Sequence, residues 1–329
     1  MKTENARLGY VDFIKGFGII LVVIGHATIP RSEWIYSFHV PLFFFISGYV
    51  NKERTFFENL RSKLSSIYFP FVIFNILTWI FFFIITLLKG DITNSSNKVN
   101  LFRTIIGFEN SVPQNGPLWF LLCLFTVSII YSILCILKNE YLKFLLVVCV
   151  GTGGYFLSEL YTDLPFKIET AMVMLFFFYT GSIISKTGIS AKIDNIPLIH
   201  VLNISFALSF LHYLLNAWNI SSSGIERVSV LENRYGTVLL FFLSAFAAVS
   251  YIFILSKKID NIRSINFLGE NSLLILCFHY PVLQYIERIH PAFLSDNFFL
   301  DFISSGLTIA LCIPLIYLSK TVFRLILKQ

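Results

Sequence analysis

A lysine and a histidine stand eleven positions apart in one apolar run near the start of the chain, Lys15 and His26 within residues 10–30. On an α-helix, eleven residues turn about 20° beyond three full turns and rise about 16 Å, so the two side chains share a face at different depths. Histidine is the usual general base near neutral pH, and a lysine cation binds phosphate. Asp12, three residues before Lys15, can pair with it. One end of this stripe could therefore hold an anion while the other removes a proton.

The same stripe also has a structural explanation. The Lys15 side chain could extend to the lipid headgroups, and His26 could be a hydrogen-bonded interface residue. Ionisable residues inside membrane helices usually face an interior cavity or pathway, which favours function. Whether other polar residues converge on the stripe decides between the two.

Two further histidines lie in apolar segments that could approach it. His39 is in "FHVPLFFFISGYV" (38–50), and the short loop before it places it near the same end of the neighbouring helix as His26. His279 lies near the middle of the segment that contains "FLGENSLLILCFHYPVL" (267–283). A helix-end hydrogen bond is the structural alternative for His39, but three intramembrane histidines exceed what anchoring requires. Residues at the starts of two later helices complete the candidate set: Asn115 and Trp119 in one, Asn271 and Ser272 in the other.

The elements that must hold these residues are membrane helices. Of 329 residues, 56% are hydrophobic and 13% charged, and the mean hydropathy of +0.75 is outside the range of ordinary soluble proteins. A bilayer core about 30 Å thick needs roughly 20 apolar residues per helix. Polar breaks divide the chain into about ten such segments: 11–29, 35–50, 66–88, 117–137, 141–158, 168–185, 196–215, 236–256, 271–289 and 299–319.

The distribution of charge predicts the orientation of these helices. An even number of spans puts both termini on one side, and more than twice as many lysines and arginines fall on the side of the N-terminus as on the other. Cytoplasmic loops are rich in these residues. We therefore expect an all-α, polytopic integral membrane bundle of about ten helices, with both termini cytoplasmic, formed by a single domain over residues 1–329. The net charge of +6 then requires no nucleic-acid partner.

The five cysteines do not indicate a metal or disulfide framework. All five lie in apolar segments, and none forms a CxxC pair. We expect them to pack as small core residues, and we expect no metal site.

Four motifs together resemble one enzyme family. The runs "VDFIKGFGIILVVIGH", "FHVPLFFFISGY", "GPLWFLLCLF" and "LGENSLLILCFHYP" occur in this order. With them the chain is similar, from about residue 7 to 320, to the membrane-bound acyltransferase-3 family. It resembles especially the sugar O-acetylase branch, which includes fucose 4-O-acetylase-like and enterobacterial common antigen O-acetyltransferase proteins. The most specific signature is a Lys or Arg followed by ten residues and a His, here Lys15 and His26.

The resemblance implies a multi-pass enzyme of the bacterial inner membrane. Such an enzyme moves an acyl group, usually acetyl, from cytoplasmic acyl-CoA to a sugar hydroxyl of a cell-surface or lipid-linked glycan. Acyl-CoA is then a co-substrate, and no tightly bound cofactor is implied. By motif position, His26 matches the essential histidine and Lys15 its basic partner. Many relatives carry Arg-x-x-Arg after the second helix, whereas "LRSKLSS" gives Arg61 and Lys63 at a different spacing.

Chemistry then assigns expected roles to these residues. A sugar hydroxyl is a weak nucleophile at neutral pH, so His26 would act as general base. Lys15, with Arg61 and Lys63 on the same side, would hold the CoA phosphates. His39 and His279 would orient His26 or stabilise the oxyanion, and Asp12 belongs to the same catalytic group. The candidates for substrate binding are Trp119, Asn115, Asn271 and Ser272, with Trp119 stacked on a sugar ring.

Three alternatives stay open at this point. The acyl group could pass directly to the sugar or through an acyl-histidine intermediate. The protein could instead be a transporter or glycan flippase whose intramembrane histidines line the pathway. A purely structural membrane scaffold leaves the shared face of Lys15 and His26 unexplained.

Overall fold

The computed structural model describes residues 9–27, 32–88, 101–109, 111–160, 164–260, 262–294 and 297–327, and most of them are helical. The helices are α1 (Gly9–His26), α2 (Glu33–Tyr36), α3 (His39–Tyr49), α4 (Phe56–Lys63), the π-helical turn η1 (Leu64–Tyr68), α5 (Phe69–Leu88), α6 (Leu101–Ile105), the 3-10 turn η3 (Pro113–Leu118), α7 (Trp119–Leu134), α8 (Glu140–Leu160), η4 (Pro165–Lys167), α9 (Ile168–Lys186), α10 (Ile189–Asp194), α11 (Leu198–Ser223), α12 (Val238–Ser256), α13 (Arg263–Glu270), α14 (Ser272–Ile289), η5 (Pro291–Leu294) and α15 (Phe298–Leu327).

The predicted polytopic helical membrane bundle is confirmed. Among the described residues, eight helical stretches are long and apolar enough to cross a membrane. All ten predicted segments coincide with helices, but α3 and α14 are not among the eight. α3 has only 11 residues, and eleven residues rise about 16 Å, roughly half the thickness of a bilayer core. α14 has 18 residues and carries Glu287 and Arg288 in its last turn.

Contacts divide the chain into two compact units. Unit 1 comprises Met1–Ile46, Ile183–Ser229 and Arg234–Gln329, and unit 2 comprises Ser47–Ser182 and Val230–Asn233. Each unit is described by itself. The expected single domain over residues 1–329 stays a prediction.

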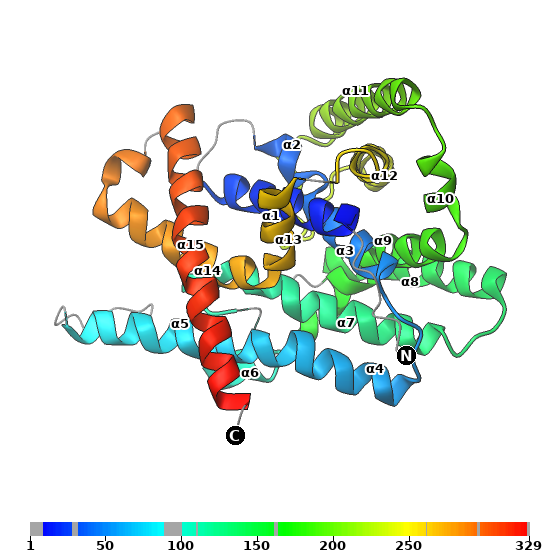
Figure 1. Cartoon of the computed structure of the whole chain (residues 1–329). Helices are drawn as coiled ribbons and strands as arrows, with labels where there is room; N and C mark the ends of the chain where they lie inside the picture. Colours follow the sequence, from blue (N-terminus) through cyan, green and yellow to red (C-terminus); the bar gives the residue numbers. More distant parts are fainter. Residues whose placement is uncertain are drawn as a thin grey trace, which may run out of the picture. The chain divides into compact units, whose positions relative to one another are not determined.

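In unit 1, α1 crosses α13 at very short range (Figure 1). A methyl group on Gly16 would lie 2.0 Å from the carbonyl oxygen of Ile265, and one on Gly269 would lie 1.8 Å from that of Asp12. Only residues without a side chain allow two helix backbones to approach this closely. The two glycines therefore fix the first half of α1 against the short helix that leads into α14.

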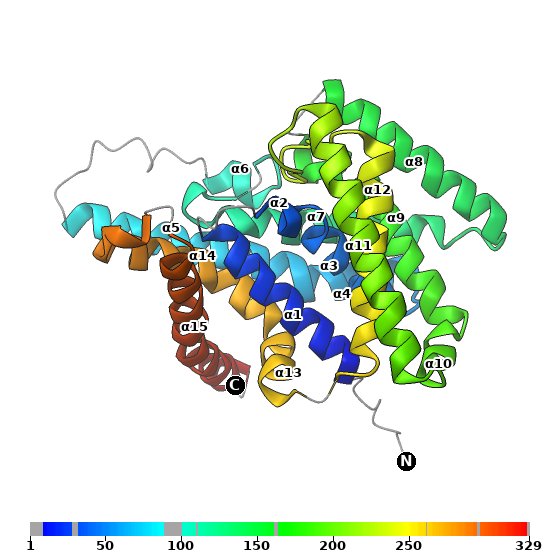
Figure 2. The ribbon, with the colours of Figure 1, turned by 90° about the horizontal axis from the view of Figure 1, so that it is seen from above.

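The rest of unit 1 is built from helix pairs. α11 and α12 lie side by side along most of their length, and α14 packs against α15 (Figure 2). The connection between α11 and α12 is held by the buried Asn219 side chain, which donates to the carbonyl oxygen of Tyr235 at 2.9 Å and accepts from the Thr237 N–H at 2.7 Å. These bonds fix both the end of α11 and the start of α12.

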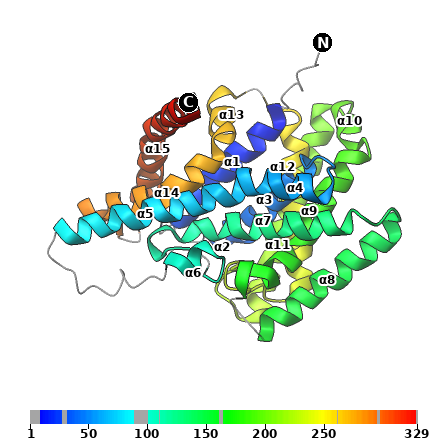
Figure 3. The same ribbon diagram turned by 90° about the horizontal axis from the view of Figure 1, so that it is seen from below.

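In unit 2, α4, η1 and α5 form one continuous helical rod that runs beside α7 (Figure 3). It begins with a capping box between Thr55 and Glu58. Pro70 has no N–H to donate, and just before it the N–H of Phe69 bonds the carbonyl oxygen five residues back, that of Leu64. The rod begins at Phe56, so the prediction of a helix over 66–88 missed the first ten residues of the rod.

Candidate active site

His26 and His279 face each other in unit 1. His26 ends α1, His279 lies in the middle of α14, and their rings meet edge to face with centroids 5.1 Å apart. His279 is fully buried and His26 is half-buried. Tyr280 completes the group, because its ring lies 5.5 Å from that of His26. The structure therefore brings two of the three candidate histidines together.

The backbone selects the same tautomer in all three candidate histidines. The Nδ1 atom of His26 lies 2.7 Å from the carbonyl oxygen of Val22, and that of His39 lies 2.8 Å from the carbonyl oxygen of Ile35. Nδ1 of His279 lies 3.0 and 2.9 Å from two carbonyl oxygens in the preceding turn. A carbonyl oxygen only accepts, so each Nδ1 carries the proton and donates it. In the neutral ring, Nε2 is then the acceptor.

The Nε2 atoms differ in what they can reach. Nε2 of His279 is buried and has no hydrogen-bond partner among the described residues. A buried polar atom normally has a partner, so a hydroxyl or water fits here. His26 has the same tautomer but is half-buried, so its Nε2 can meet a substrate. A neutral ring with an acceptor Nε2 cannot donate to an oxyanion, so the expected oxyanion role of His39 and His279 does not fit this tautomer. Orientation of His26 stays a prediction for both residues.

His39 is connected to this group through Tyr36. The Tyr36 ring meets His39 edge to face at 5.1 Å, and its hydroxyl donates to the carbonyl oxygen of Gly25 at 2.8 Å. Tyr36 therefore links His39 to the residue before His26. The guanidinium of Arg227 lies 4.2 Å from the centroid of the Tyr36 ring. The structure thus brings three predicted histidines together and adds an arginine.

The other predicted residues of unit 1 lie away from the histidines. Asp12 is buried and Lys15 is half-buried in the first half of α1, about 16 Å along the helix from His26. Asn271 and Ser272 mark the corner between α13 and α14, about 12 Å along α14 from His279. Since α13 packs on the first half of α1, these four belong to one end of the unit. Asn271 is buried, and its Oδ1 has no hydrogen-bond partner among the described residues.

Four predicted residues belong to unit 2. Arg61 is exposed and Lys63 is half-buried, both on α4 rather than in a loop. Asn115 is fully buried and donates to the Thr78 hydroxyl at 3.1 Å, so it also holds η3 against α5. Trp119 is buried at the start of α7. Their substrate-binding and CoA-binding roles stay predictions.

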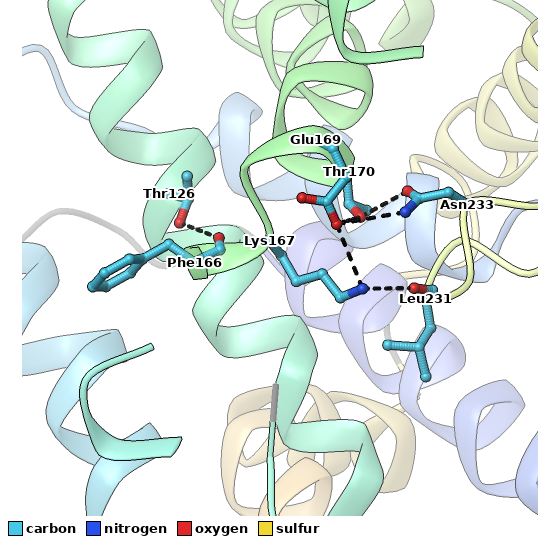
Figure 4. A network of polar contacts seen from close by, with 7 residues as sticks. All are labelled: Thr126, Phe166, Lys167, Glu169, Thr170, Leu231 and Asn233. Carbon is cyan, nitrogen blue, oxygen red and sulfur yellow. Dashed lines mark hydrogen bonds and ion pairs between the residues drawn. The ribbon is translucent and has the colours of Figure 1, made fainter. Parts of the chain in front are cut away.

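A second polar cluster lies inside unit 2 (Figure 4). Lys167 and Glu169 are fully buried and form an ion pair, Nζ to Oε1 3.5 Å. Lys167 also donates to the carbonyl oxygen of Leu231 at 2.9 Å, and the Thr170 hydroxyl donates to Oδ1 of Asn233 at 2.8 Å. The backbone of Lys167 and of Asn233 is left-handed, with φ of 51° and 56°. The cluster holds a strained turn in place, and we interpret it as structural.

Sequence reasoning missed Arg227, Tyr36 and Tyr280. Arg227 is one exposed arginine in a polar connection, and nothing in its neighbours indicates a site. Tyrosine is common at the ends of membrane helices, so neither Tyr36 nor Tyr280 indicates a site by its residue type. Tyr280 had one usable signal, because it follows a candidate histidine directly. Arg227 and Tyr36 become visible only when the fold brings their segments together.

A family model described as an acyltransferase domain matches residues 8–317. No curated protein and no solved structure matched the chain. The match covers every predicted site residue, from Asp12 to His279.

Proposed function

This chain belongs to the membrane-bound acyltransferase-3 family, and from that premise we propose that it is an O-acyltransferase of a bacterial inner membrane. The acyl group, acetyl in our proposal, comes from acyl-CoA on the cytoplasmic side. The acceptor is a sugar hydroxyl of a cell-surface or lipid-linked glycan. Membership of the family makes the protein an acyltransferase; the donor, the acceptor and the residue roles are the proposal.

The observation that carries this proposal is the tautomer of His26. Its Nδ1–H is committed to the carbonyl oxygen of Val22, so the neutral ring offers Nε2 as a proton acceptor. The ring sits at the end of a membrane helix and is half-buried, where a substrate can reach it. A fixed, accessible acceptor nitrogen is what a general base for a hydroxyl requires.

The proposed reaction is direct transfer. The sugar hydroxyl donates its proton to Nε2 of His26 while its oxygen forms a bond to the thioester carbonyl carbon. The carbon–sulfur bond then breaks, and the CoA sulfur leaves and takes up the proton. His279 presents a second acceptor nitrogen beside His26 and would bind another hydroxyl of the sugar. Asp12 is kept in the proposed catalytic group because it lies one helical turn from Lys15 and can pair with it.

The donor would lie along α1. Its phosphates would bind near Lys15, and its pantetheine arm would extend about 16 Å along the helix to His26. Asn271, at the corner between α13 and α14, has a buried amide oxygen without a hydrogen-bond partner among the described residues. This oxygen could accept a hydrogen bond from the donor at the Lys15 end of the path. Ser272, Arg61, Lys63, Asn115 and Trp119 remain proposed binding residues.

Replacement of the base tests the proposal. His26→Ala should lower acyl transfer from radiolabelled acetyl-CoA to the host's glycan by at least about a hundredfold, because general-base catalysis contributes that much. NMR of surface glycans should show the loss of the acyl ester signals. His200→Ala is the matched control, since His200 is exposed on α11 and is not part of the cluster.

Two results would contradict the proposal. Unchanged glycan ester in cells that carry correctly inserted His26→Ala would exclude the base role. Movement of a sugar ligand across proteoliposomes without any consumption of acyl-CoA would favour the transporter instead.

A further inference from the structure

Arg227 is held beside the reactive end of α1. It lies in the connection between α11 and α12, which Asn219 fixes at both ends. Its guanidinium stacks on the Tyr36 ring at 4.2 Å. Tyr36 is fixed in turn, because its hydroxyl donates to the carbonyl oxygen of Gly25, the residue before His26. A methyl group at Gly25 would be in van der Waals contact with this ring, at 3.4 Å. The cation therefore has a defined place relative to the base.

No acidic side chain among the described residues neutralises Arg227, although it is exposed and always charged. Two other described cations that stack on aromatic rings are each paired with a carboxylate as well: Arg103, which stacks on Phe108 and lies 3.2 Å from Glu109, and Lys257, which stacks on Tyr10 and lies 2.9 Å from Asp194.

The stacked geometry leaves the binding edge of the guanidinium open. The Cζ atom of Arg227 lies over the Tyr36 ring, so the ring occupies one side of the guanidinium and the residue is otherwise exposed. The five N–H donors of a guanidinium point outward in its plane. Such an edge binds a carboxylate or a phosphate through two parallel hydrogen bonds. A fixed, stacked and unneutralised guanidinium is therefore prepared for an anion from outside the chain.

We propose that Arg227 binds an anionic group of the acceptor, so that the enzyme selects glycans with a carboxylate or phosphate near the hydroxyl that is acylated. This inference rests on the proposed function, because it takes the ligand at His26 to be the acceptor. The ligand class is an acidic sugar: a uronic acid supplies a carboxylate, and a glycosyl phosphate supplies a phosphate.

The donor is a poorer match for this subsite. Under the proposed function, the CoA phosphates bind near Lys15, about 16 Å along α1 from His26, while the thioester reaches the histidine. Arg227 lies at the His26 end of that path, because it stacks on Tyr36, whose hydroxyl donates to the carbonyl oxygen of Gly25. During transfer His26 gains a positive charge, which Arg227 repels, and a bound anion would screen that repulsion. A negative charge on the acceptor sugar would then favour both its binding and the acyl transfer.

Direct binding tests the subsite without any acyl transfer. The full-length protein is purified in dodecyl maltoside, a detergent without phosphate, and titrated calorimetrically with methyl glucuronoside, glucose 1-phosphate and methyl glucoside. Wild-type protein should bind at least one acidic probe about tenfold more tightly than the neutral one, as expected for charge-assisted hydrogen bonds. Arg227→Gln should remove the preference, and Arg227→Lys should keep part of it. Arg103→Gln, the stacked arginine that already has a carboxylate partner, should change nothing.

The outcomes separate the two proposals. Preference for the glucuronoside identifies a carboxylate ligand, and preference for glucose 1-phosphate identifies a phosphate. Equal binding of all three probes by the wild type overturns the subsite, as does a preference that survives in Arg227→Gln. An equal loss of binding for all three probes in that variant overturns it too. Intact anion preference in a protein that transfers no acyl group refutes only the proposed function.

Discussion

At the scale of the residue, the site depends on which ring nitrogen carries the proton. His279 donates through Nδ1 to its own helix, so its buried Nε2 is an acceptor without a partner among the described residues. The same arrangement at His26 places two acceptor nitrogens on rings whose centroids are 5.1 Å apart. One hydroxyl proton can go to one of them only. In the proposed reaction, the second acceptor would therefore bind a different hydroxyl and orient the sugar.

His279→Phe keeps an aromatic ring and removes this acceptor. We expect kcat/KM for the acceptor sugar to fall about three- to tenfold, the usual effect of one hydrogen bond, while KM for acyl-CoA stays unchanged. Steady-state kinetics with each substrate varied in turn measures both values. His200→Phe is the control, because His200 is exposed on α11. A rise in KM for acyl-CoA alone would place His279 on the donor side and contradict this role.

The sequence predicts only part of this residue-scale picture. The shared face of Lys15 and His26 follows from helix periodicity, because both lie on one element. The pairing of His26 with His279 needs the packing of α1 and α14, which the sequence suggests through intramembrane polarity alone. Arg227 and Tyr36 could not be predicted, since their contact joins a polar connection to a short helix far away in the sequence.

At the scale of the element, hydropathy predicted the helices where burial in lipid decides the structure. It failed at α4, where most residues are polar or charged, although Thr55 and Glu58 show the spacing of a capping box. The predicted segment 35–50 is already shorter than the roughly 20 residues that a span needs, and α3 within it has only 11. The close crossing of α1 and α13 depends on Gly16 and Gly269 meeting backbone across it, which a single sequence does not reveal.

The ion pair of Lys167 and Glu169 makes a prediction at this scale. Both side chains are fully buried, and Lys167 also bonds the turn at Leu231. Lys167→Met should destabilise the protein by about 3–5 kcal/mol, because it leaves the Glu169 charge buried without its partner. Thermal unfolding in detergent should show a clear drop in midpoint for this variant.

The double variant Lys167→Met/Glu169→Met separates charge from packing. Removing both charges should recover much of the lost midpoint, since well-packed apolar residues often replace a buried ion pair without loss. Lys143→Met is the control, because Lys143 pairs with a half-exposed Glu140. A double variant as unstable as the single one would show that the lysine acts through packing or through its bond to Leu231.

At the scale of the whole molecule, the proposed reaction requires that α11 cross the membrane in a fixed direction. The positive-inside bias predicts that Lys192, before α11, is cytoplasmic and that Ser221, near its end, is outside. The connection that carries Arg227 begins directly after α11. If this orientation holds, Arg227 is on the side from which a surface glycan arrives.

Single cysteines on either side of α11 test that orientation. Lys192→Cys and Ser221→Cys, both at exposed positions, are introduced in a background with Cys135 and Cys149 replaced by alanine, because the remaining three cysteines are buried. A membrane-impermeant maleimide should label Ser221→Cys in intact cells and Lys192→Cys only after permeabilisation. The reverse pattern would put Arg227 on the cytoplasmic side and leave the acceptor no route to it from outside. Equal labelling of both in intact cells would show that α11 does not span the membrane.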